Sequence, residues 1–228
     1  MSGGAAASGF GTGPLSRASA LIHTLLVVEV MLLAAASPGL AALLLLGRAP
    51  SNLPLAAVCL VPLGPAVSAA VHVLHRRTRD LTELHPARAY RRAWRLNALP
   101  ALRLWAPLLA WLTVIGFSLT HFPAAGVPGW WAGLLALIGG ASLVWGGHAL
   151  VISALFAFRT ADTARLAAYF VLRRPGASLA VLSLLVLTAG LTLLATEAAA
   201  VLLAAPLLMS LLHGLRTVIA ETEEDFTV

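Results

Sequence analysis

The chain of 228 residues is 60% hydrophobic and 11% charged, whereas about a quarter of the residues of an ordinary soluble domain are charged. A soluble globule of this size buries only about 70 to 75% of its unfolded surface, so it needs a polar exterior that this composition does not supply. The single cysteine excludes a disulfide framework and a thiolate metal site. The net charge of +6 comes from fifteen arginines whose positions matter more than their sum, so we do not expect nucleic-acid binding.

Residues 1–17 begin with a run of Gly, Ala and Ser without periodicity, which predicts a disordered cytoplasmic leader. The apolar run Leu21–Leu46 follows and is long enough for a first membrane span, which needs roughly 20 residues. A cleaved secretory signal ending at Ala36 is the alternative. Glu29 within the run, and ten further apolar residues after Ala36, argue against cleavage.

A second span is predicted over Leu53–Leu74, and Pro62, Gly64 and Pro65 interrupt it. Each proline removes a backbone donor and Gly64 allows an open backbone, so we expect a kink at which carbonyl groups face a cavity. A kinked helix without a cavity is the alternative.

The polar segment His75–Arg103 separates this span from a third span, Ala101–Phe122, and holds eight of the fifteen arginines. Within it, Tyr90, Ala93, Trp94 and Asn97 recur at spacings of three and four. This pattern predicts an amphipathic helix that lies on the membrane surface.

The fourth predicted span, Trp130–Phe158, follows an uncharged turn rich in Pro and Gly and opens on two tryptophans typical of an interfacial aromatic belt. A second basic segment, Arg159–Arg174, comes next. Its Leu166, Tyr169, Phe170 and Arg173 again have helical spacing, which predicts a second surface helix.

The last apolar stretch, Ser178–Leu215, has one charge, Glu197. As a single helix its 38 residues would reach about 57 Å, far more than a bilayer requires. We therefore expect a break at Thr196 and Glu197. It would divide the stretch into a fifth span, residues 178–195, and a sixth span, residues 198–215. An acidic tail, residues 217–228, ends the chain, and without the break there are five spans.

The predicted fold is all-α: a single polytopic transmembrane bundle, residues 18–216, with five or six spans and two amphipathic cytoplasmic surface helices. With six spans and the amino terminus in the cytoplasm, fourteen arginines lie on that side and only Arg48 on the other. Such a bias predicts cytoplasmic loops in the cell membrane, and enforcing this topology is one complete explanation of the arginines.

Two ionisable residues fall at membrane depth, where a carboxylate costs at least about 2.5 kcal/mol on insertion scales. Glu29 lies near the middle of the first span and His148 in the inner half of the fourth. Both lie on the same side of the midplane, so we expect a Glu29–His148 hydrogen bond. It would be part of a proton or polar-substrate path, or a structural pair.

No pattern of residues predicts a cofactor or an enzyme. His72 and His75 are three apart and have His85 or His213 as further neighbours, but no acidic ligand has a matching spacing, so we expect no metal site. A serine elbow, a phosphate loop and paired aspartates are absent from the sequence.

The second span and the following basic helix carry a family resemblance. The residues concerned are Val61-Pro62-Leu63-Gly64-Pro65-Ala66, Ala69, Ala70, Tyr90, Trp94, Arg95 and Asn97. In these residues and in its span layout the chain resembles the YesL-like family of small bacterial membrane proteins, whose biochemical activity is undefined. Members of that family are often found with carbohydrate uptake systems, so the resemblance implies an accessory role near a sugar ABC transporter.

Two functions follow as hypotheses. In the first, the protein is a non-enzymatic accessory or regulatory component of carbohydrate uptake, and Arg91, Arg92, Arg95 and Asn97 contact a transporter subunit or anionic lipid headgroups. In the second, it is a small autonomous transporter or channel that uses the intramembrane residues Glu29 and His148 and the kink at Pro62, Gly64 and Pro65. A membrane-embedded enzyme that acts on a lipid or polyprenyl substrate is a third class, and no motif in the sequence supports it.

Overall fold

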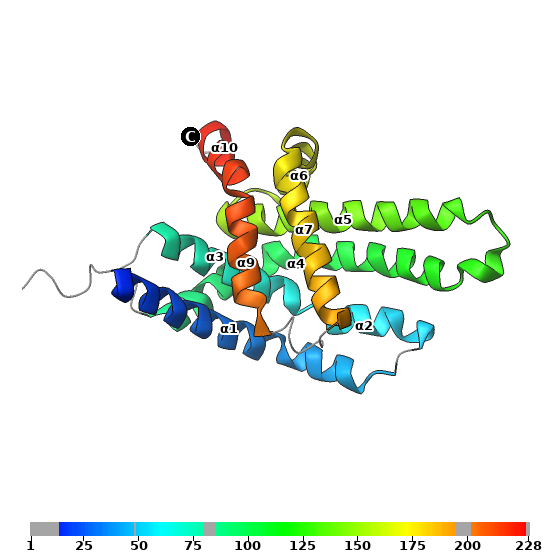
Figure 1. The fold of residues 1–228 in the computed structure, drawn as a ribbon, viewed down its shortest axis with the longest axis horizontal. Helices are drawn as coiled ribbons and strands as arrows, with labels where there is room; N and C mark the ends of the chain where they lie inside the picture. Colours follow the sequence, from blue (N-terminus) through cyan, green and yellow to red (C-terminus); the bar gives the residue numbers. More distant parts are fainter. Residues whose placement is uncertain (1–13, 48, 80–84, 195–201, 227–228) are drawn as a thin grey trace, which may run out of the picture.

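The structure, a computed structural model, describes residues 14–47, 49–79, 85–194 and 202–226, and the regular structure within them is helical. Figure 1 shows the helices in chain order. They are α1 (Pro14–Leu45), η1 (Pro50–Asn52), α2 (Leu53–Cys59), α3 (Leu63–Arg79), α4 (Pro86–Thr120), η2 (Phe122–Ala125), α5 (Trp130–Leu155), α6 (Thr160–Arg173), α7 (Pro175–Leu194), α9 (Ala204–Gly214) and α10 (Arg216–Phe226).

Four of these helices are long and apolar enough to cross a membrane: α1, α4, α5 and α7. The pair α2 and α3 adds a fifth if it is counted as one bent span. α9 has 11 residues and is therefore about 16 Å long, roughly half of a hydrocarbon core. The predicted break at Thr196 and Glu197 lies outside the described residues.

The predicted second span is divided into α2 and α3, whose axes differ by 42°. The turn between them covers Leu60 to Pro62, and Pro65 lies in the first turn of α3, where a missing backbone N–H leaves no helical bond unmade. The bend therefore falls where the Pro62, Gly64 and Pro65 motif predicts it.

The third predicted span and the basic segment before it form one helix, α4, of 35 residues and about 52 Å. The predicted separate surface helix is therefore wrong for this segment, because the basic part and the apolar part belong to one continuous helix. Two side chains hold this helix against its neighbours. Near its start Tyr90 donates to the Ala66 carbonyl, and further along Trp105 donates to the Leu60 carbonyl, so α4 follows α3 and the turn before it.

The second basic segment does form a separate helix, α6, but its buried face differs from the predicted one. Thr163, Ala167 and Phe170 are buried, whereas Tyr169 is 43% exposed. The indole of Trp145 in α5 donates to the Ala164 carbonyl of α6 over 3.0 Å. This bond from α5 accounts for the side of α6 that faces inward.

α3 forms the centre of the packing and contacts α1, α4, α5 and α9. Its buried residues are mostly small, which allows the neighbouring helices to approach closely. They include Ala66, Ala69, Ala70, Val73 and Leu74. α7 and α9 run side by side across one face of this bundle, at a steep angle to α4 and α5 (Figure 1).

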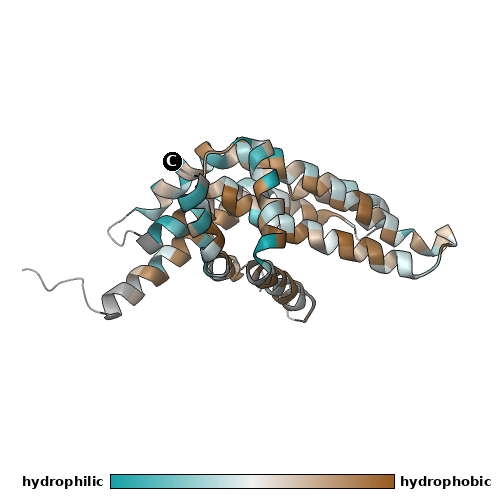
Figure 2. Ribbon diagram, turned by 90° about the horizontal axis from the view of Figure 1, so that it is seen from above, coloured by the Kyte–Doolittle hydropathy of each residue, from teal (hydrophilic) through white to brown (hydrophobic). Residues whose placement is uncertain are grey.

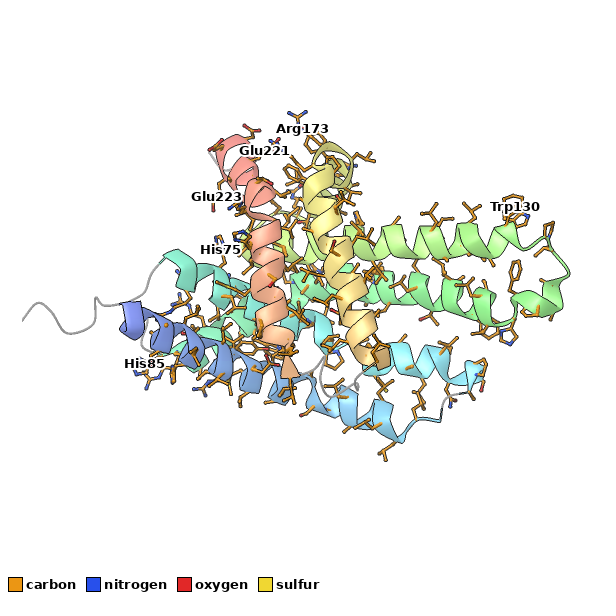
Figure 3. The ribbon with its side chains drawn as sticks, in the orientation of Figure 1. His75, His85, Trp130, Arg173, Glu221 and Glu223 are labelled. Atoms are coloured by element: carbon orange, nitrogen blue, oxygen red, sulfur yellow. The ribbon has the colours of Figure 1, made fainter. Side chains whose placement is uncertain are left out.

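The polar and apolar residues are separated along the longest axis. In Figure 2 the free end of the α4–α5 hairpin is mostly brown and white, and hydrophilic residues gather toward the end that carries the C-terminus. Trp130 lies at the tip of the hairpin and His85 at the opposite end of the molecule (Figure 3). The arginine-rich segments thus lie away from the hairpin tip.

Candidate functional site

Glu29 lies on α1 and is 7% exposed, so its carboxyl group is buried within the helices. Its Oε2 accepts a hydrogen bond from the backbone N–H of Ala205 over 2.6 Å. Ala205 is the second residue of α9, where backbone N–H groups have no partner within the helix. Glu29 therefore caps the N-terminus of α9 from another helix, and the positive end of the α9 dipole favours this oxygen acceptor.

His148 lies on α5 and is fully buried. Its Nδ1 is 3.0 Å from the carbonyl oxygen of Val144, one turn earlier in the same helix. Its Nε2 is buried without a hydrogen-bond partner, and so is Oε1 of Glu29.

The predicted Glu29–His148 hydrogen bond is therefore wrong. Glu29 bonds the backbone of α9, while His148 bonds its own helix. The arrangement of the helices gives the reason, because α3 packs against α1 and also against α5. Each residue keeps one buried polar atom without a hydrogen-bond partner, and such atoms cost free energy and are uncommon in folded proteins.

The bend between α2 and α3 is filled by an aromatic side chain of α4. The indole nitrogen of Trp105 donates to the Leu60 carbonyl over 2.9 Å, and a Cβ placed on Gly64 would lie 2.5 Å from Cγ of Trp105. The absence of a side chain at Gly64 thus provides the space for the indole. At Leu60 the expected open cavity is replaced by this contact, so the motif acts through packing.

The four residues predicted to contact a partner or lipid divide into two groups. Arg91, Arg92 and Arg95 are exposed on the first turns of α4. Asn97 is half-buried and donates to the Ala154 carbonyl over 3.1 Å. Asn97 therefore holds α4 to the end of α5, and the three arginines alone face outward.

The Ala154 carbonyl also accepts a second bond, from Nδ1 of His72 in α3 over 2.8 Å. The last carbonyls of a helix have no partner within it, so these two side chains cap the C-terminus of α5. A cavity of about 310 Å³ adjoins this cap, between α4 and the α5–α6 junction. Its lining includes both capping residues, Ser153, Phe156 and Thr163.

A second cavity, also of about 310 Å³, lies between α3, α9 and α10. It brings together His75 and His213, which the sequence analysis considered only as members of a metal site. Among the described residues no group of three His, Cys, Asp or Glu side chains is placed to hold a metal ion. Residues of α10 complete the lining of this cavity, which sequence spacing alone did not reveal.

The acidic tail forms the helix α10, and Glu221 connects it to the C-terminal end of α6. Its carboxylate accepts from Arg173 at 3.2 Å and from Arg174 at 2.6 Å, and Figure 3 shows Arg173 and Glu221 facing each other. The hydrogen bond from Arg174, together with that from Arg173, lowers the pKa of Glu221 below its ordinary value. Local charge compensation explains this part of the tail.

No family model, no curated protein and no solved structure matches this chain.

Proposed function

We propose that this chain is an integral protein of the cell membrane with its arginine-rich end in the cytoplasm. The proposal is supported by the four long apolar helices and by the bias of fourteen arginines against one. Arginine-rich segments next to spans remain on the cytoplasmic side during insertion. A reporter that is active only in the cytoplasm, fused after Val228, tests the position of the carboxyl terminus.

Within this membrane the protein acts as a non-enzymatic accessory or regulatory component that contacts a partner or anionic lipid headgroups. The observation that carries this proposal is the length of α4. A span needs only about 20 of its 35 residues, so about four turns of helix extend beyond the hydrocarbon. Arg91, Arg92 and Arg95 are exposed on those turns.

These three guanidinium groups have no acidic partner among the described residues, whereas Arg173 and Arg174 are paired with Glu221. Unpaired cations on a rigid helix suit an acidic protein surface or an anionic membrane, to which each contributes about 1 kcal/mol near the surface. The partner that we propose is a subunit of a sugar ABC transporter. This choice depends on the YesL-like resemblance of the bent span and α4.

The test is purification from native membranes in a gentle detergent, followed by mass spectrometry of the proteins that remain bound. We expect a transporter permease or ATPase at near-stoichiometric yield. Replacing Arg91, Arg92 and Arg95 by Gln should abolish its recovery. Arg159→Gln with Arg165→Gln, at exposed positions just before and within α6, should not. A protein that is recovered alone, with sugar uptake unchanged on deletion, contradicts the accessory role.

A small autonomous transporter or channel is the second candidate. It is favoured by the buried atoms without partners on three helices: Oε1 of Glu29, Oγ of Ser68 and Nε2 of His148. Polar atoms left unpaired at membrane depth are typical of substrate and proton paths. Flux into liposomes that contain only this protein, lost in Glu29→Gln and His148→Ala, supports it, and impermeable liposomes exclude it.

A further inference from the structure

The cavity between α3, α9 and α10 has an apolar floor and a polar rim. Met209 and Leu212 come from the apolar helix α9, and Ile219 from the buried side of α10. The rim holds His213 and Arg216, both exposed at the junction of the two helices. The volume of about 310 Å³ accommodates a small polar group together with part of a hydrocarbon chain.

The position of this cavity along the helices indicates its depth in a membrane. α9 is mostly apolar up to His213 in its last turn, and α10 begins with Arg216 and carries the acidic residues. α3 changes in the same way, because the buried Leu74 is followed by His75 in the rim and by the exposed Arg76. In both helices the sequence thus changes from apolar to polar beside the same cavity. In a bilayer such a change occurs at the level of the lipid headgroups.

We propose that this cavity binds the phosphodiester group of a membrane phospholipid, with the start of an acyl chain over Met209 and Leu212. The inference rests on the proposed membrane location, but not on a transporter partner. Arg216 presents a planar fork of N–H donors that matches two phosphate oxygens, and a ring N–H of His213 adds a third donor. The apolar floor next to these donors favours a lipid over free phosphate.

Glu223 indicates which type of lipid headgroup fits the cavity. It follows Arg216 by seven residues, so both lie on the same face of α10 and both line the cavity. Figure 3 shows Glu223 and His75 on the side of α9 and α10 where the cavity lies. A carboxylate beside the site disfavours a doubly charged phosphomonoester, so the site selects the singly charged diester of phosphatidylglycerol over phosphatidic acid.

The experiment uses the full chain in detergent, titrated with phosphatidylglycerol and followed by native mass spectrometry. Arg216→Gln removes the fork, and Ala220→Leu fills the cavity without changing its charge. Each should weaken binding about tenfold, the loss expected for one charge-assisted hydrogen bond or for blocked access. The control Arg165→Gln, at an exposed position of α6 away from the cavity, should bind as the wild type does.

Three results would overturn the proposal. The first is equal binding by Arg216→Gln and the wild type, and the second is an equal loss in Arg165→Gln, which indicates a general charge effect. The third is equal binding of a glycolipid that has the same acyl chains but no phosphate. Competition by inorganic phosphate alone would assign the site to the free ion. A chain that stays in solution without detergent would instead refute the membrane location.

Discussion

The helices α5 and α7 are almost equally apolar, but they differ in burial. Of the most apolar stretch of 18 residues in each helix, 44% is buried in α5 and only 11% in α7. Polar side chains account for the difference. α5 receives bonds from His72 and Asn97 and donates through Trp145 to α6. α7 makes one such bond near its start, from Ser178 to the Val171 carbonyl of α6, whereas its Thr188 and Thr192 bond only the preceding turn of their own helix.

This difference teaches that hydropathy identifies a helix suited to lipid, whereas side-chain bonds to neighbouring carbonyls decide which of those helices form a bundle. The bundle of α3, α4 and α5 should therefore respond strongly to substitutions at its contacts. The pair α7 and α9 should tolerate them, except where Glu29 attaches α9 to α1. Four predictions test this, in order of decreasing effect.

Two glycines give the sharpest contrast. Gly64→Ala would place a Cβ 2.5 Å from the ring of Trp105, and displacing this rigid indole should lower the free energy of unfolding by about 2 to 3 kcal/mol. Gly190→Ala in α7 meets nothing within 4 Å and should leave it unchanged or raise it by up to about 1 kcal/mol. Equilibrium unfolding of both purified variants measures this, and equal losses would remove the contrast.

The contact of Glu29 with α9 is the exception within the pair α7 and α9, because it should be sensitive to substitution. Glu29→Leu leaves the buried N–H of Ala205 without an acceptor and should cost about 2 kcal/mol. Glu29→Gln keeps an oxygen acceptor and should cost much less. Hydrogen exchange at the Ala205 amide reports the bond directly, and unchanged protection in Glu29→Leu would show that the cap is dispensable.

Trp105→Phe keeps an aromatic ring at the bend but removes its bond to Leu60. We expect a loss of about 1 kcal/mol, since the carbonyl still accepts from the backbone N–H of Leu63. Trp111→Phe is the matched control, because Trp111 is 50% exposed and its indole bonds only Ser142, in a hydrogen bond that is exposed to solvent. Thermal unfolding distinguishes the two, and an equal response would mean that the bend needs no donor.

The smallest effect is the pH dependence of α10. Arg174 and Arg173 lower the pKa of Glu221, so their bonds stabilise the docked helix fully above the ordinary carboxyl value of 4.5 and are lost as the pH falls below it. Spin labels on α6 and α10 should move apart between pH 5 and pH 3. In Glu221→Gln this change should vanish, and a persistent change would assign it to other carboxylates.

The sequence predicted those parts of the fold that depend on local composition. The long apolar runs gave the all-helical class and the positions of α1 and α5, whose observed ends at Leu45 and Leu155 lie within three residues of the predicted ones. The prolines gave the bend before α3. Each of these features is encoded by neighbouring residues, which a single sequence displays.

The failures concern interactions between distant residues. The change from basic to apolar sequence near Pro100 suggested two separate helices, but one helix continues across this boundary and bonds α3 through Tyr90. The partner of Glu29 is a backbone N–H, which has no signature of its own. A signal was nevertheless present, since Pro206 is typical of the first turn of a helix and marks the start of α9.

The cap on α9 also has a consequence for biosynthesis. His72 and Asn97 precede the carbonyl that they bind, so both partners of α5 already exist when it leaves the ribosome. Glu29 precedes Ala205 by 176 residues, which take roughly 9 to 35 s to translate. For this interval the carboxyl group on the first helix is without the N–H group that donates to it, so this early helix requires another donor, such as water, beside Glu29 until α9 has been made.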